Sequence, residues 1–111
     1  MDSHESPMPA FLPRVAERAR FAAEKMQKLA CVQTDRFLLG LNCFEPGQAQ
    51  KLHAHTGADK FYLVLSGKAK VVVGAEAREV SPGDLVFAPA GVEHGVETAY
   101  ERTIMLVGIT K

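Results

Sequence analysis

Short apolar runs, separated by turn-forming residues, recur along the chain after Asp35. Glycine, proline and polar residues break these runs about every eight to ten residues, which is the spacing of strands in a sandwich or barrel. In the first run apolar residues occupy both odd and even positions, as in a strand that is covered on both faces. The pattern therefore predicts an all-β domain. The runs lie at residues 37–44, 61–65, 70–73, 85–88 and 103–109.

Before these runs the pattern is helical. From residue 14 to about residue 29 the chain is rich in Ala, Glu, Arg and Lys, and apolar residues recur at steps of three and four. This period predicts a short helix, with Pro13 at or just before its first turn. Residues 26–32 fit a strand equally well, so the position of the helix end stays open. The apolar positions are Val15, Ala19, Ala22, Met26 and Leu29.

The length of the chain, 111 residues, suits one domain with a core of its own. Residues 1–12 hold prolines and polar residues without periodicity, and we expect a flexible tail there. His4 lies in this tail and is not expected to be a ligand. Residues 13–111 are expected to form the single domain.

Composition excludes several classes of partner. The chain has 13 basic residues (Lys and Arg together) and 13 acidic ones (Asp and Glu together). No basic surface for nucleic acid or an anionic membrane is therefore expected. No apolar run is long enough to cross a membrane, and no secretory signal pattern begins the chain. Cys31 and Cys43 have no CxxC spacing and are interpreted as small apolar residues. These features favour a protein of the reducing cytoplasm.

Three histidines carry the clearest chemical signal. His53 and His55 are one residue apart, which on a strand places both side chains on one face. A third imidazole from His94, on a later strand, would complete a compact nitrogen site for a divalent metal. For each histidine taken singly, a buried and hydrogen-bonded imidazole is the alternative interpretation.

Two stretches around these histidines resemble the conserved motifs of the cupin superfamily. Residues 47–67, GQAQKLHAHTGADKFYLVLSG, match glycine, five residues, HxH, four residues, the family's glutamate position, six residues and glycine. Residues 83–98, GDLVFAPAGVEHGVET, match glycine, five residues, PxG, two residues, histidine, three residues and the asparagine position. The resemblance implies a double-stranded β-helix, the cupin or RmlC-like jelly-roll barrel, here with a short N-terminal helical segment. It also implies that His53, His55 and His94 are metal ligands.

This chain departs from the motifs at two positions. Thr98 replaces an asparagine that is less closely tied to metal binding. Lys60 stands where the family has its ligating glutamate, and an ammonium beside a divalent cation costs on the order of several kcal/mol. Lys60 has three alternatives: to turn toward solvent, to become neutral beside the metal, or to bind an anion in a pocket without metal. Asp59 should point to the opposite face of the strand.

Two functions follow from these alternatives. The first is a metal-binding cupin, with or without enzyme activity, that acts on a small anionic molecule. Three neutral imidazoles suit Zn, Ni, Fe or Cu, and hold Mn²⁺ less well than a site with glutamate. The second is a metal-free module that binds or senses a small ligand through Lys60. Neither the sequence nor the resemblance selects a reaction.

A few further residues complete the expectations. Tyr62 shares the parity of Lys60 and is a second candidate for contact with a substrate, with core packing as the alternative. Val64 and Phe87 are expected to line the pocket or the core. Gln48 and Gln50 would reach a ligand or lie solvated at a strand edge. The resemblance implies a homodimer, for which the outward face of Phe61, Leu63 and Leu65 is the candidate contact.

Overall fold

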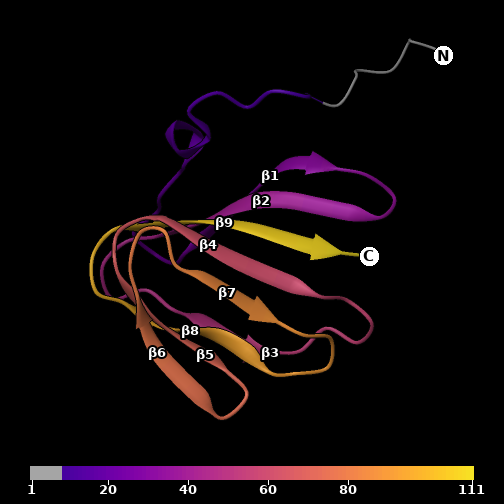
Figure 1. The fold of residues 1–111 in the computed structure, drawn as a ribbon. Helices are drawn as coiled ribbons and strands as arrows, with labels where there is room; N and C mark the ends of the chain where they lie inside the picture. The colour runs from indigo at the N-terminus through magenta and orange to yellow at the C-terminus, as the bar shows by residue number, and fades with distance from the viewer. Residues whose placement is uncertain (1–8) are drawn as a thin grey trace, which may run out of the picture.

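The computed structural model of the protein describes residues 9–111, and in this part of the chain nine strands form two facing antiparallel sheets (Figure 1). One sheet has the order β1-β2-β9-β4-β7 and the other has the order β3-β8-β5-β6. The predicted all-β class is therefore confirmed. The strands are β1 (Gln27–Gln33), β2 (Phe37–Phe44), β3 (Gln50–His53), β4 (Lys60–Ser66), β5 (Ala69–Val73), β6 (Glu76–Val80), β7 (Leu85–Ala88), β8 (His94–Ala99) and β9 (Thr103–Thr110).

The N-terminal segment corrects the predicted helix over 14–29. Only Val15–Arg18 is helical, as a single 3-10 turn, and the strand alternative for 26–32 is the correct one. β1 pairs along its length with β2, and this pairing satisfies its backbone groups better than an isolated helix would. Of the predicted tail, residues 1–8 with His4 lie outside the described residues, and residues 9–12 have no regular structure.

Polar contacts attach the segment before β1 to the barrel. Arg102 donates through Nε and Nη2 to the two carboxylate oxygens of Glu45, at 2.9 and 2.8 Å. The guanidinium of Arg102 also lies 4.1 Å from the centre of the Phe21 ring. Gln48 Nε2 donates to the carbonyl oxygen of Ala22 at 2.7 Å. Gln48 thus acts as a structural residue.

The five apolar runs coincide with β2, β4, β5, β7 and β9 to within one residue at each end. The pattern gave no signal for β6, because its sequence EAREV is exposed at four of its five positions. The glycines of the two motifs have the positive φ angles that tight turns require. Gly47, Gly67 and Gly83 have φ values of 86, 92 and 94°, a region that other residues rarely adopt.

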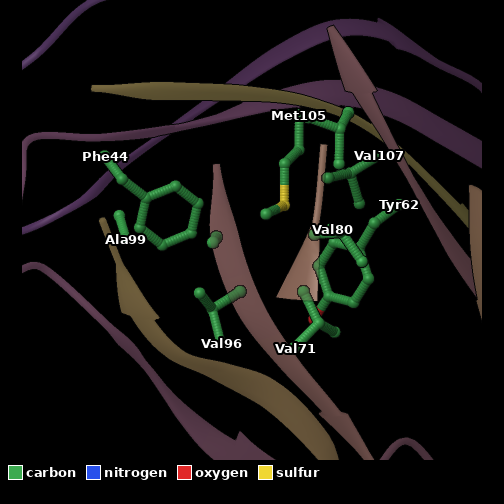
Figure 2. Packing of buried hydrophobic residues seen from close by; sticks show 10 residues of the cluster. Phe44, Tyr62, Val71, Val80, Val96, Ala99, Met105 and Val107 are labelled. Carbon is green, nitrogen blue, oxygen red and sulfur yellow. The ribbon is translucent and has the colours of Figure 1, made fainter. Parts of the chain in front are cut away.

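The two sheets enclose an apolar core at one end of the barrel. Phe44 on β2, Val64 on β4, Val96 on β8 and Met105 on β9 are at most 1% exposed. Figure 2 shows Met105, Phe44, Ala99 and Val96 pointing into the space between the sheets, with Val71 and Tyr62 beside them. Val64 confirms its predicted place in the core.

The outer face differs from expectation at Phe87. This ring is 57% exposed on β7, as is Leu85 at 65%, so the expectation that Phe87 lines the pocket is wrong. Phe61, Leu63 and Leu65 are half-buried on the outer face of β4. Pairing of two chains through that face stays a prediction. No helix among residues 9–111 is long and apolar enough to cross a membrane.

Candidate metal centre

The structure brings the three predicted histidines together inside one end of the barrel. His53 is the last residue of β3 and pairs with His94, the first residue of β8. His55 lies two residues beyond β3, in the loop, and its carbonyl oxygen accepts the N–H of Gly91 at 2.9 Å. Each histidine offers one ligand atom, and these atoms all lie within 4.8 Å of one another. The convergence predicted from the sequence is thus observed, although His55 is not on the strand.

Hydrogen bonds orient two of the rings. The Nδ1 atoms of His53 and His94 lie 2.8 and 2.9 Å from the carbonyl oxygens of Lys51 and Val92. A carbonyl only accepts, so Nδ1 carries the proton in both rings, and the Nε2 of His53 faces Lys60 Nζ at 3.4 Å. The Nε2 atoms of His55 and His94 are buried and have no partner among the described residues. Unpaired imidazole nitrogens converging in this way fit a divalent metal, and the backbone carbonyls act as the outer-shell partners that such ligands ordinarily have.

The protonation states agree with this donor set. Burial lowers the pKa of His55, and the nearby charges of Lys60, His53 and Lys28 lower it further. Burial is also the main cause that lowers the pKa of His94. Both rings are therefore held in the neutral form, which is the form that binds a metal.

Lys60 remains inside the barrel. Its side chain is 3% exposed, its Nζ lies 3.4 Å from His53 Nε2, and the same Nζ lies 4.8 Å from the centre of the Tyr62 ring. This position excludes the alternative in which Lys60 turns to solvent. Burial lowers the pKa of Lys60 from 10.5 to about 8, and the charge of Lys28 contributes.

The other predicted residues take definite places. Tyr62 is fully buried, its hydroxyl donates to Gln50 Oε1 at 2.8 Å, and burial raises its pKa. Its ring centre lies 6.2 Å from that of His94, so it forms the floor between the histidines and the apolar core. Asp59 points away from the histidines, as expected, and its Oδ1 accepts the N–H of Ala90 at 2.9 Å.

Two buried amides lie near the histidines: Asn42, which sequence reasoning missed, and Gln50, for which it left open contact with a ligand or a solvated strand edge. Asn42 on β2 is 4% exposed and Gln50 on β3 is 7% exposed, yet Asn42 Nδ2 and Gln50 Nε2 have no partner among the described residues. A buried donor left unpaired costs about 1–3 kcal/mol. A register shift between Gln50 and His53 lets both side chains face inward, although they are three residues apart. Strict alternation would have placed Gln50 on the outer face.

Two cavities adjoin the centre. One, of about 310 Å³, is lined by His55, Lys60, Asn42 and Lys28 together with apolar residues of β1, β2 and β9. The other, of about 590 Å³, opens beside His53 and Gln50 between β3 and the start of β1. Lys28 lines both. A third cavity, of about 400 Å³ between β5, β6 and β7, lies away from the histidines.

Comparison with known proteins places the chain in a family. The model of the family described as "Cupin domain" matches residues 40–109, which include all three histidines and Lys60. The chain is a cupin. A crystal structure of TT1209 from Thermus thermophilus has a TM-score of 0.82 and 41% identity, and the match covers 86% of this chain and 92% of that one.

Two further comparisons give a relative in sequence and a neighbour in fold. An uncharacterized protein of Streptomyces coelicolor is 41% identical over 71 residues, which are 62% of this cupin and 65% of the relative. The match thus spans somewhat less than two thirds of that relative's length. An RmlC-like cupin from Desulfovibrio desulfuricans shares the fold with a TM-score of 0.77 at 22% identity, over 96% of this chain and 97% of that one.

Proposed function

We propose that this cupin binds one divalent transition metal ion through Nε2 of His53, His55 and His94, and acts on or binds a small anionic molecule beside it. The observation that carries the proposal is the pair of buried, unpartnered Nε2 atoms on His55 and His94, within reach of His53. Zn, Ni, Fe and Cu suit three neutral imidazoles better than Mn²⁺ does. A bound ion would supply Lewis-acid chemistry at coordination positions that the histidines leave open.

Lys60 takes a substrate-binding role in this proposal. Its Nζ lies beside His53 and is enclosed by the barrel, where a cation is stabilised by an anionic partner. The family's glutamate would make the site more negative, whereas Lys60 makes it more positive. A negatively charged molecule would offset the repulsion between Lys60 and the ion. Tyr62 supports this arrangement from below by holding Gln50 in place.

The test is elemental analysis of protein purified without chelator. We expect close to one transition metal ion per chain in the wild type. His53→Ala and His94→Ala should each lose that metal, while His4→Ala, a histidine outside the described residues, should keep it. Metal content that is unchanged in His94→Ala would refute the assignment.

A second function is favoured by one specific contact. Lys60 Nζ lies 3.4 Å from His53 Nε2, and in a protein without metal this contact would persist. The cupin would then be a metal-free module that binds or senses a small anion through Lys60. For this function Lys60→Ala should weaken ligand binding, and treatment with a chelator should leave the binding unchanged.

A further inference from the structure

The 310 Å³ cavity beside His55 has hydrogen-bond donors and positive charge on its wall. Asn42 is only 4% exposed, and its Nδ2 has no partner among the described residues. Lys60 Nζ lies in the same cavity, where its described hydrogen-bond contact is His53 Nε2. The cavity therefore presents an amide donor with no acceptor in the described part of the chain, and an ammonium whose described partner is a single histidine nitrogen.

The register of the sheet adds a second cation next to Asn42. Lys28 on β1 pairs directly with Asn42 on β2, so the two side chains project from the same face as close neighbours. Asn42 pairs in turn with Met105, which points into the barrel. Lys28 is exposed and lines the opening of the cavity, whereas Asn42 lies deeper. Together they form a row of donors on the wall of the cavity that His55 and Lys60 also line.

The row carries no compensating negative charge in the described part of the chain. None of the ion pairs between described residues involves Lys25, Lys28, Lys51 or Lys60. Lys25 and Lys51 line the neighbouring cavity beside His53, so the opening of the barrel is lined by lysines on both sides. Hydrogen-bond donors and cations without acceptors match an oxyanion, whose oxygens accept several charge-assisted hydrogen bonds.

We propose that Asn42 and Lys28 form an oxyanion subsite that holds the carboxylate or phosphate group of a small molecule next to the metal centre. This inference rests on the proposed function, because the subsite adjoins the same three histidines. It narrows the ligand to a small molecule with one oxyanion end, since a cavity of about 310 Å³ is at the lower limit for ligand pockets. Lys60 lines the same cavity and contacts His53.

Calorimetry on zinc-loaded protein tests the subsite with three probes: lactate, inorganic phosphate, and lactamide as the uncharged analogue of lactate. We expect lactate or phosphate to bind one per chain, and lactamide to bind at least about tenfold more weakly. Tighter binding of lactate than of phosphate would indicate a ligand with a carboxylate group, and the reverse order a ligand with a phosphate group. Asn42→Leu and Lys28→Met should each weaken anion binding about tenfold while zinc content stays at the wild-type level.

Lys68→Met is the matched control, because it removes a lysine that pairs with Glu79 and that lines neither cavity beside the histidines. It should bind the anion as the wild type does. Equal anion affinity in wild type, Asn42→Leu and Lys28→Met would overturn the subsite, as would equal binding of lactate and lactamide. Zinc-free protein that binds lactate with the same dependence on Asn42 and Lys28 would support the subsite and refute only the metal-dependent function.

Discussion

The two ends of the barrel interior are made by the same strands, yet they differ in chemistry. β4 contributes Val64 to one end and Lys60 to the other, and Asn42 on β2, level with Met105 and Val64 in the sheet register, lies where the apolar core borders the cavity beside His55. At the apolar end the buried side chains pack against one another (Figure 2). At the histidine end, buried nitrogens of His55, His94, Asn42 and Gln50 lack partners in the described structure.

The apolar end contributes to the stability of the barrel, whereas the histidine end contributes the groups for binding. The apolar end gains free energy when its side chains leave water. The histidine end loses free energy, because buried polar groups without partners are costly. A protein keeps such groups where a ligand supplies the missing partners, so the histidine end is the part of the barrel that is organised for binding. Substitutions at the two ends should therefore have opposite effects on stability.

The largest effect is expected at the apolar end. Phe44→Ala removes a fully buried ring and should lower the free energy of unfolding by about 3–5 kcal/mol. Metal bound per folded molecule should not change, because Phe44 does not contact the histidines. Urea unfolding followed by circular dichroism measures the first quantity and elemental analysis the second. Loss of metal from the folded variant would show that the two ends are coupled.

At the histidine end, Lys60→Met should stabilise the metal-free protein. The pKa of Lys60 is about 8 in the folded protein, against an ordinary value of 10.5 in the unfolded chain. Between these values the unfolded chain binds more protons than the folded protein, so stability rises with pH. Below pH 8 the folded wild type carries the full cost of the buried charge, up to about 3 kcal/mol at about 1.4 kcal/mol per pKa unit.

The measurement is urea unfolding of wild type and Lys60→Met in the presence of a chelator, at pH 7 and at pH 10. The variant should be the more stable protein at pH 7, and its advantage should shrink toward pH 10 as wild-type Lys60 loses its proton. If Lys60→Met is less stable than the wild type at pH 7, Lys60 stabilises the fold. The histidine end would then not carry the cost in stability that we infer for it.

Substitution of Asn42 should also stabilise the protein, by less than Lys60→Met does. Replacing it by leucine removes an unpaired buried amide and should raise the free energy of unfolding of the ligand-free protein by about 1–3 kcal/mol. If Asn42→Leu is destabilising instead, the amide has a structural partner and the histidine end is less specialised than we infer.

Much of the fold could be predicted from the sequence, because the strands of the core have apolar runs bounded by turn residues. The two motif stretches also predicted the convergence of His53, His55 and His94. What escaped prediction depends on pairing between strands. The sequence of β1 fitted the end of a helix and a strand equally well, and its pairing with β2 decides for the strand. Asn42 was one polar residue in an apolar run, and its inward position follows from its neighbours on β1 and β9.

The central claim is that three imidazoles bind one metal ion through Nε2. Two-dimensional ¹H–¹⁵N spectra of the histidine side chains, recorded while zinc is added, test it most directly. We expect the Nε2 resonances of His53, His55 and His94 to shift together and saturate at one equivalent, while Nδ1 of His53 and His94 stays protonated and His4 does not change. Spectra in which these three histidines do not respond, or in which only one of them does, would contradict it.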